Sequence, residues 1–403
     1  LSANPEPLAL ILDAVVIGEI EPIFEPLTDA LHLIAEDREQ ALSALSHIPG
    51  LYLPNYEPQS PDQKVIARQV LRDLDAFPSH SVILTPDTEF ADMGLIEIAR
   101  GCGRGCRFCL AGYTYRPARQ RSVEAILAQS RRLLRDTKRI GLVSAAVSDH
   151  QQIDLLAVQL RELGARISVS SMRVDPVSEP LVQALADSGT RTLTIAPEAG
   201  SQRLREVINK DQTEEHVLHA TELAAHHGFE QIKLYFMVGL PTETEDDMVC
   251  LVDLALSCAA RFPRKVTVNL TPFVPKAHTP FQRLAQTPAK TMKRRISYVE
   301  RVLRKRGIAV KSESPAWAEI QGTLARGDRR LTQAILATDR LTPSAWRQSL
   351  SKSDLSLEEL LGQRADAETL PWAMILGSVP PEYLDREAAR SRTTEPLSPA
   401  PGY

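Results

Sequence analysis

The chain has 403 residues, of which 43% are hydrophobic, so it is long enough to bury one large core and one or two smaller units. Its 47 Lys and Arg residues against 51 Asp and Glu residues give a formal net charge of −4. That balance does not predict a polyanion-binding surface over the whole chain, so nucleic acid has no support as a partner. No apolar run reaches the about 18 residues that a membrane span requires.

Cysteine use predicts the compartment. The chain has five cysteines, three of them clustered, and this pattern is not a disulfide framework, so it predicts a reducing, cytoplasmic environment. The first residue is Leu1 rather than methionine, which is typical of a fragment or a trimmed product. No secretory signal is recognisable at this end.

The first segment, residues 1–53, carries one strand signal and one helix signal. The run AVVIG at 14–18 predicts a strand, and the pattern over 22–37 predicts a helix. These two elements are too few to fold alone, and we interpret them as a partial Rossmann-like α/β segment. Residues 54–90, which open with the proline-rich stretch 54–64, are predicted to be a linker.

Between residues 91 and 310, short β-type runs alternate with helical patterns. Six runs are apolar enough to be buried on both faces: 95–99, 139–147, 166–171, 191–196, 231–239 and 265–270. The helices between them have start and stop signals, with Ser122 at one beginning and Gly164, Gly189 and Gly228 after three ends. This alternation predicts parallel strands in a doubly wound sheet or a barrel. We expect an α/β fold with a partial (βα)6 TIM-like barrel, whose chemistry lies at the carboxyl ends of the strands.

The last part of the chain, residues 311–403, is expected to contain helices but no further strands of the barrel. Residues 311–390 show mostly helical, polar patterns, which predict a helical C-terminal extension. Residues 391–403 are rich in proline and polar residues and are expected to be a disordered tail.

Cys102, Cys106 and Cys109 lie within eight residues, in the stretch GCGRGCRFCLAG. A structural zinc site would need a fourth ligand, and the nearest histidines, His80 and His150, are distant in sequence. A buried, inert trio is disfavoured by the arginines and glycines between the cysteines, which predict an exposed loop. The third interpretation is an iron-sulfur cluster held by three thiolates, which leaves one iron open for chemistry.

The C-x3-C-x2-C spacing, with the aromatic Phe108 before the last cysteine, resembles the signature of the radical S-adenosylmethionine (radical SAM) superfamily. The stretches IAPEAGSQRLREVINK, LYFMVGLPTETEDD and PFVPKAHTPFQ are similar to the branch that has a cobalamin-binding-type N-terminal domain, and the resemblance spans about residues 8–380. It implies that Cys102, Cys106 and Cys109 hold a 4Fe-4S cluster whose open iron binds S-adenosylmethionine. Reductive cleavage then gives a 5'-deoxyadenosyl radical, which abstracts hydrogen from a substrate.

The resemblance also implies contacts to S-adenosylmethionine from Phe108, Ser144, Ser171, Arg173 and Glu198. Ser144 follows the second strand, where the superfamily often has Gly-Gly-Glu and this chain has SAAVSDH. On the third strand, Ser171 is expected to reach the ribose and Arg173 the carboxylate. Glu198, in a PEAGS turn, is expected to accept hydrogen bonds from ribose hydroxyls. The alternative for each of these residues is a solvated strand end.

The case for cobalamin is weaker. Residues 1–53 resemble the last part of a cobalamin-binding domain, but Ile20 stands where the family's Gly-Glu-Gly-Glu turn has glycine. No Asp-x-His-x-x-Gly motif occurs in the chain. Cobalamin is therefore a candidate cofactor for which the sequence of this chain gives no support of its own.

We predict a radical SAM enzyme of unidentified substrate, supplied with electrons by a donor such as flavodoxin or ferredoxin. Methyl transfer is the leading reaction if the complete protein binds cobalamin. Two alternatives stay open. One is a non-catalytic iron-sulfur sensor or scaffold, and the other is an RNA-modifying radical SAM enzyme that uses the basic stretches 131–139 and 293–306. The tRNA methylthiotransferase relatives are disfavoured because the chain lacks the three further upstream cysteines that they need.

Overall fold

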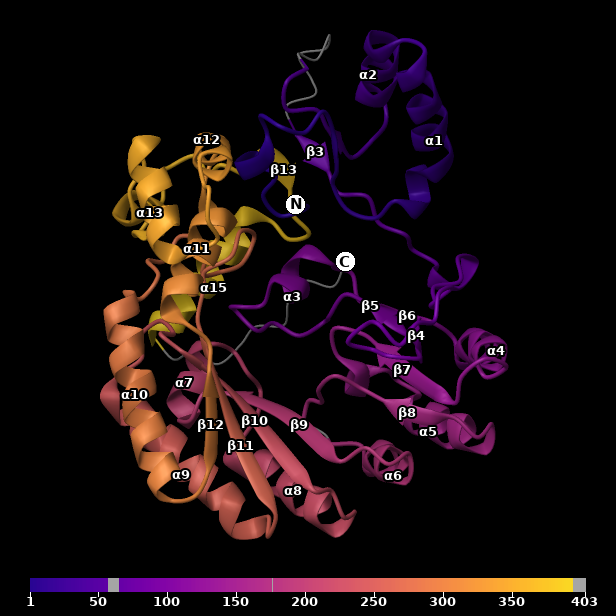
Figure 1. Cartoon of the computed structure of the whole chain (residues 1–403), viewed down its shortest axis with the longest axis vertical. Coiled ribbons are helices and arrows are strands. Elements are labelled where there is room, and N and C mark those ends of the chain that lie inside the picture. Colours follow the sequence, from indigo (N-terminus) through magenta and orange to yellow (C-terminus); the bar gives the residue numbers. More distant parts are fainter. Residues whose placement is uncertain (57–64, 176, 394–403) are drawn as a thin grey trace.

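The computed structural model describes residues 1–56, 65–175 and 177–393. Two parallel sheets form its lower half in Figure 1, with strand orders β4-β7-β8 and β12-β11-β10-β9. A parallel bridge between Met172 and Ile195 joins the segment after β8 to β9. The strands of these sheets are β4 (Met93–Glu97), β7 (Arg139–Val143), β8 (Arg166–Ser168), β9 (Thr192–Glu198), β10 (Gln231–Val238), β11 (Lys265–Pro272) and β12 (Ala309–Ser312).

The α/β class with parallel strands is confirmed, and all six predicted runs contain a strand. β7 ends at Val143, earlier than predicted, because the Ser144 hydroxyl then accepts the Ala146 N–H in a turn. β12 is a seventh parallel strand, which the sequence did not predict. Its four residues include two polar side chains, so they give no apolar run to recognise.

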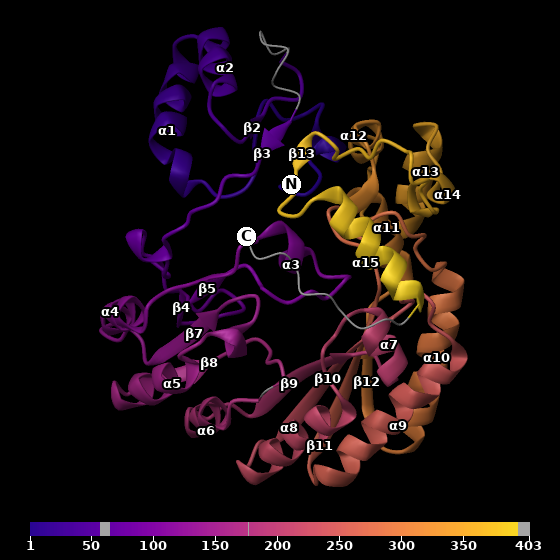
Figure 2. The same cartoon turned by 180° about the vertical axis from the view of Figure 1, so that it is seen from behind.

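Helices flank the outer sides of both sheets (Figures 1 and 2). Ser122 caps the first of them, since its hydroxyl accepts the Ala125 N–H at 3.1 Å. Gly164, Gly189 and Gly228 have φ of +77°, +78° and +80°, as expected for glycine after a helix end. The flanking helices are α4 (Val123–Leu133), α5 (Ile153–Glu162), α6 (Glu179–Asp187), α8 (Glu214–His226), α9 (Glu245–Arg261) and α10 (Ala289–Lys305).

The N-terminal segment lies above the sheets in Figure 1 and is tied to the end of the chain. β1 (Val15–Val16) pairs with β2 (Leu51–Tyr52), and α1 (Phe24–His32) and α2 (Arg38–Ser46) lie between them in the sequence. Within the stretch predicted to be a linker, β3 (Ile66–Ala67) pairs in parallel with β13 (Ile375–Leu376). The predicted linker and the C-terminal part therefore share a two-stranded sheet.

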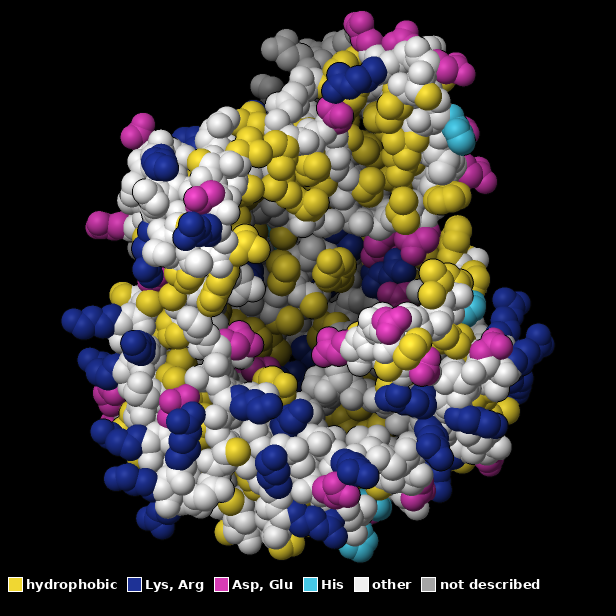
Figure 3. All heavy atoms as spheres, viewed as in Figure 1, with side chains coloured by type: hydrophobic (Ala, Val, Ile, Leu, Met, Phe, Trp, Pro, Cys, Tyr) yellow, Lys and Arg dark blue, Asp and Glu magenta, His cyan; other side chains and the backbone are white. Residues whose placement is uncertain are grey.

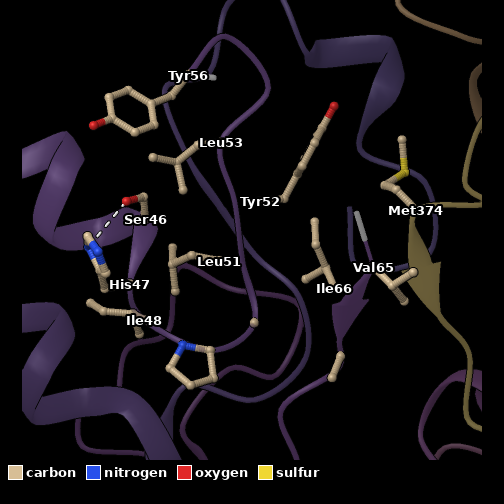
Figure 4. Close-up of a pocket in the computed structure, with 13 residues that line it drawn as sticks. Ser46, His47, Ile48, Leu51, Tyr52, Leu53, Tyr56, Val65, Ile66 and Met374 are labelled. Atoms are coloured by element: carbon tan, nitrogen blue, oxygen red, sulfur yellow. Dashed lines mark hydrogen bonds between the residues drawn. The ribbon is translucent and has the colours of Figure 1, made fainter. Parts of the chain in front are cut away.

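A pocket of about 380 Å³ opens in this segment. Figure 4 shows Tyr52 and Tyr56 on different sides of it, with Leu51 and Leu53 between them. The dashed line in Figure 4 joins Ser46 Oγ and His47 Nδ1, which lie 3.4 Å apart. Met374 completes the wall, so the pocket is lined by the N-terminal segment, the predicted linker and the C-terminal part.

The C-terminal part is helical, with α11 (Pro315–Arg326), α12 (Leu331–Leu336), α13 (Pro343–Lys352), α14 (Leu357–Leu361) and α15 (Pro381–Thr393). The first three residues of the predicted disordered tail, 391–393, belong to α15, because that helix packs on the body of the protein through Tyr383 and Leu384. The rest of that tail, 394–403, lies outside the described residues. No helix in the described part of the chain is long and apolar enough to cross a membrane.

Candidate active site

The three clustered cysteines lie on a loop between β5 (Ala99–Arg100) and α3 (Leu110–Thr114). This loop and α3 occupy the centre of the molecule in both cartoon views (Figures 1 and 2), where the space-filling view is hollowed (Figure 3). Cys106 is buried, and Cys102 and Cys109 are half-buried. Gly101 begins the loop at φ +79°, and a Cβ there would lie 2.0 Å from the Tyr115 carbonyl oxygen, so this turn requires glycine.

The thiols of the loop lie in a poorly solvated place. Burial raises the pKa of Cys102, and it raises the pKa of Cys109 to about 11, with a further contribution from Cys106. A bound metal centre would supply the positive charge that keeps such thiols deprotonated. No three His, Cys, Asp or Glu side chains of the described residues are arranged as a finished metal site. The donor set itself, three soft thiols beside arginines, fits an iron-sulfur cluster.

Arg173 connects this loop to the end of the third strand. Its Nη1 lies 3.7 Å from the Cys106 sulfur, and its Nη2 donates to Asp175 at 2.7 Å. Asp175 also accepts from Arg104 at 3.4 Å, and Arg104 pairs with Asp149 at 2.9 Å. Burial opposes the charge of Arg173, but the charges of Cys106 and Asp175 outweigh it and raise the pKa of Arg173. A guanidinium is thus fixed beside the central cysteine.

One atom of this guanidinium has no partner. Arg173 Nε is buried and forms no hydrogen bond within the part of the chain that the structure describes. A buried donor without a partner costs about 1–3 kcal/mol, so a bound acceptor would be stabilised here. The predicted role of Arg173 toward a carboxylate is consistent with this unused donor.

Glu198 lies at the carboxyl end of β9, next to the bulge in the pairing of β9 and β10. Its φ of +67° is unusual for a residue with a side chain. Its Oε1 lies 3.2 Å from Nζ of the buried Lys210. The charge of Glu198 is therefore held in place, and its other oxygen forms no hydrogen bond with the described residues.

The other predicted contacts have different surroundings. Ser144 is already engaged in the turn after β7. Ser171 is exposed, directly before the bridge residue Met172. Phe108 packs against an apolar cluster that includes Phe273. Arg173 contacts the cysteine loop, whereas no hydrogen bond among the described residues joins the side chain of Ser144 or Ser171 to it.

Sequence reasoning missed several charged residues of this site. Asp149 and Asp175 orient the arginines, Arg104 joins the two aspartates, and Lys210 pairs with Glu198. Their position in the sequence could have identified two of them as site residues, because Asp149 and Asp175 follow the ends of β7 and β8. Chemistry in parallel α/β folds gathers at those ends.

A buried ion pair fixes the cysteine loop to the C-terminal helix α15. Arg107 and Glu387 are each 1% exposed, and their side chains lie 3.1 Å apart. Arg107 also donates to the carbonyl oxygens of Glu206 and Val207, at 3.0 and 2.9 Å, at the end of α7 (Gln202–Val207). The loop therefore depends on a residue 280 positions further along the chain.

Replacing Glu387 with glutamine is expected to lower the free energy of unfolding by about 2 kcal/mol, because Arg107 then stays buried without a counter-charge but keeps its backbone partners. Urea unfolding measures this change. Glu382→Gln, at an exposed position of the same helix, is the matched control and is expected to change it by less than about 0.5 kcal/mol. Equal effects of the two variants would contradict the structural role of the buried pair.

The base of the loop is held by the N-terminal segment. Both carboxylate oxygens of the buried Glu19 pair with Arg119, at 2.8 and 2.9 Å. The same carboxylate accepts from Arg100 at 3.1 Å, from Arg68 at 3.3 Å and from the Leu71 N–H at 2.8 Å. Arg100 directly precedes the loop, on β5, and Arg119 lies on the paired strand β6 (Arg119–Gln120). A single carboxylate thus joins residues 1–53 to the cysteine loop.

This carboxylate is expected to make stability acid-sensitive. Burial alone would raise the pKa of Glu19, but the hydrogen bonds and charges of its partners lower it from 4.5 to about 2. The stabilisation is complete above pH 4.5 and is lost as the pH falls from there to 2, which corresponds to roughly 3 kcal/mol. Urea unfolding at several pH values measures the loss. In Glu19→Gln the free energy of unfolding should fall less over this pH interval. An unchanged fall would show that Glu19 is not the group that makes stability acid-sensitive.

Comparisons with known proteins show the family of this chain. Residues 96–255 match the model of the Radical SAM superfamily, and residues 1–54 match the model named Radical SAM proteins, N-terminal. The chain is 34% identical over 365 residues to the uncharacterized protein MJ0966 of Methanocaldococcus jannaschii, which covers 89% of this chain and 76% of that protein. The chain belongs to the radical SAM superfamily.

Other matches of this radical SAM protein are more distant. It is 27% identical over 165 residues to the tRNA-2-methylthio-N(6)-dimethylallyladenosine synthase of Bdellovibrio bacteriovorus, over 38% of this chain and 36% of that one. The structure of TsrM, a radical S-adenosylmethionine methyltransferase from Kitasatospora setae, matches with a TM-score of 0.49 and 16% identity. That match covers 66% of this chain and 53% of TsrM.

The radical SAM protein is an enzyme whose cofactors are a 4Fe-4S cluster and S-adenosylmethionine. The residues present fit these groups, since three soft thiols share one loop and the unused Nε donor of Arg173 lies on the guanidinium that contacts Cys106. Together the two cofactors supply an organic radical. The protein's own part is to hold the cysteine loop, to orient charge beside it and to exclude water.

Proposed function

We propose that this protein cleaves S-adenosylmethionine reductively and uses the resulting 5'-deoxyadenosyl radical to abstract hydrogen from a substrate. The observation that carries the proposal is the contact of Arg173 with Cys106, at 3.7 Å, with Asp175 fixing the guanidinium. Cys102, Cys106 and Cys109 would bind the cluster. This arrangement supports binding of an anionic cosubstrate at the loop.

Each remaining residue then has a role that its surroundings support. Arg173 would donate its unused Nε–H to the carboxylate of S-adenosylmethionine. Glu198, held by Lys210, would accept hydrogen bonds from ribose, with the exposed Ser171 and the half-buried Ser144 as further hydroxyls near the ends of other strands. Phe108, part of an apolar cluster, would help to keep water from the radical.

The proposed function also includes an architecture and an electron donor. We propose that the two sheets together form a partial barrel, with residues 91–310 as its core and residues 1–53, 54–90 and 311–390 as the N-terminal segment, linker and C-terminal extension. A small electron carrier such as flavodoxin or ferredoxin would reduce the cluster in a reducing cytoplasm. If the complete protein binds cobalamin, as the resemblance of residues 1–53 to part of a cobalamin-binding domain suggests, the reaction that follows hydrogen abstraction would be methyl transfer.

The test is the formation of 5'-deoxyadenosine, measured by mass spectrometry on protein reconstituted anaerobically with iron and sulfide. With S-adenosylmethionine and dithionite we expect the product, and without dithionite we expect none. The spectrum of the reduced cluster in electron paramagnetic resonance should also change when S-adenosylmethionine is added. A protein that assembles a cluster but shows neither effect is a sensor or scaffold, and the proposal is then withdrawn.

A further inference from the structure

The second sheet has one apolar face and one polar face. Alternate side chains of its strands point to opposite sides, and one set, with Leu193, Ile232 and Val266, packs in the main core with the flanking helices. We call the other side the inner face. It carries mainly polar side chains, together with Ala196 and Met237; the polar ones, partly buried or exposed, include Thr194, Lys233, Tyr235, Asn269, Thr271 and Lys311. The inner positions of closed barrels hold bulky aliphatic side chains, so a polar inner face indicates a ligand surface.

Strand register arranges three of these residues in a row. Tyr235 pairs with Asn269, and Asn269 pairs with Lys311, across β10, β11 and β12. Neighbouring strands lie about 4.8 Å apart, so the row spans about 10 Å. Tyr235 directly precedes Phe236, the register partner of Glu198. Tyr235 therefore lies about one residue step, about 3.3 Å, from the predicted ribose contact along the strands and one strand, about 4.8 Å, from it across the sheet, whereas Lys311 at the far end of the row lies about 14 Å from β9.

The polar side chains of this face form hydrogen bonds at the amino ends of the strands, whereas one in the row has an atom without a hydrogen bond. At the amino end, Gln231 bonds to Thr267 at 2.6 Å and to Thr192 at 3.4 Å. In the row, Asn269 Oδ1 is buried and accepts no hydrogen bond from the described residues. An unpaired buried carbonyl costs about 1–3 kcal/mol, so a donor on a ligand would be stabilised there.

The charges of this face are also unbalanced. Neither Lys233 nor Lys311 forms an ion pair or side-chain hydrogen bond with any residue that the structure describes. Of the nearby carboxylates, Glu198 pairs with Lys210, and Glu313 accepts from the Thr271 hydroxyl at 3.3 Å. Lys311 is the register partner of Asn269, and Lys233 lies two residues before Tyr235 on the neighbouring strand, so two ammonium groups share a face with an unpaired amide oxygen. This combination is complementary to an anion that also carries a hydrogen-bond donor.

We propose that the inner face binds the substrate, and that the substrate is a small molecule with a carboxylate or phosphate group. Lys233 and Lys311 hold the anionic group, and Asn269 Oδ1 accepts from an N–H or O–H of the same molecule. The proposal rests on the proposed function, because it places the substrate within reach of the radical formed near Glu198. It assigns a substrate class to a site whose substrate is unidentified.

Isothermal titration of the anaerobically reconstituted protein tests the proposal, with inorganic phosphate, succinate and uncharged succinamide as separate probes. We expect phosphate or succinate to bind, which distinguishes a phosphorylated from a carboxylated substrate, and succinamide to bind at least tenfold more weakly. Lys233→Met combined with Lys311→Met should weaken anion binding at least tenfold. Lys311→Met alone, on a short exposed strand, should weaken it severalfold without affecting folding.

The matched control is Lys293→Met combined with Lys305→Met, at two exposed positions of α10, which removes the same charge from the outer side. Equal loss of binding in the two double variants, or no binding of either anion to the wild type, overturns the proposal. The 5'-deoxyadenosine assay of the wild type separates the two claims. If the wild type forms 5'-deoxyadenosine but binds no anion, only the substrate assignment fails. If it binds an anion but forms no 5'-deoxyadenosine, only the radical function fails.

Discussion

Replacing Cys106 with alanine is expected to abolish 5'-deoxyadenosine formation. Cys106 is the buried cysteine of the loop, its carbonyl accepts the Cys109 N–H at 3.0 Å, and its sulfur contacts Arg173. Loss of a residue that only supports a metal ligand costs about 10- to 100-fold in affinity or activity. Loss of one of three ligands should therefore cost about a thousandfold or more, and mass spectrometry of 5'-deoxyadenosine measures it.

The control for this variant is Cys250→Ala, which removes an exposed thiol from α9, outside the loop. It should keep the iron content, the absorption of the cluster and the yield of 5'-deoxyadenosine. Iron and sulfide analysis shows whether Cys106→Ala fails at cluster assembly. If Cys106→Ala retains both its cluster and its product, the three-thiolate assignment is wrong.

The second large effect is expected for Glu19→Gln. In this variant Arg68, Arg100 and Arg119 stay close together without the carboxylate that all three contact. Removing one partner from a buried ion pair costs about 3–5 kcal/mol, and urea unfolding should show a loss of that size at pH 7. Since Arg100 directly precedes the cysteine loop, the amount of cluster after reconstitution should fall as well.

Asp13→Asn is the matched control in the same N-terminal segment. Asp13 pairs with Arg38, but the two side chains are 65% and 64% exposed. Such surface pairs contribute about 0–1 kcal/mol, so this variant should keep both stability and cluster content. If Glu19→Gln behaves like Asp13→Asn, the N-terminal segment does not hold the loop in place.

Local sequence patterns predicted the secondary structure of the core well, because each signal was contained in a few neighbouring residues. The cap at Ser122 and the glycine after α5, Gly164, are examples. β12 was missed because its burial depends on β11 and not on its own composition. The glycine that the related family has at the position of Ile20 is not required in this chain, since the φ of Ile20 is −82°.

The candidate site was predictable only where its residues are adjacent in sequence. Spacing alone brought the three cysteines together, and the family resemblance added Arg173 and Glu198. The partners of these residues, such as Asp175 and Lys210, come from different strand ends, so no local pattern joins them. The contact of Arg107 with Glu387 is the extreme case, because only the tertiary fold brings them together.

The ion pair between Arg107 and Glu387 has a consequence for the order of events during synthesis. Translation produces the cysteine loop early, but its partner in α15 emerges 280 residues later. Contacts of such long sequence separation form late in folding, and chains fold from the N-terminus as they are made. The contact that fixes Arg107 of the loop to α15 therefore forms only after residue 387 has left the ribosome.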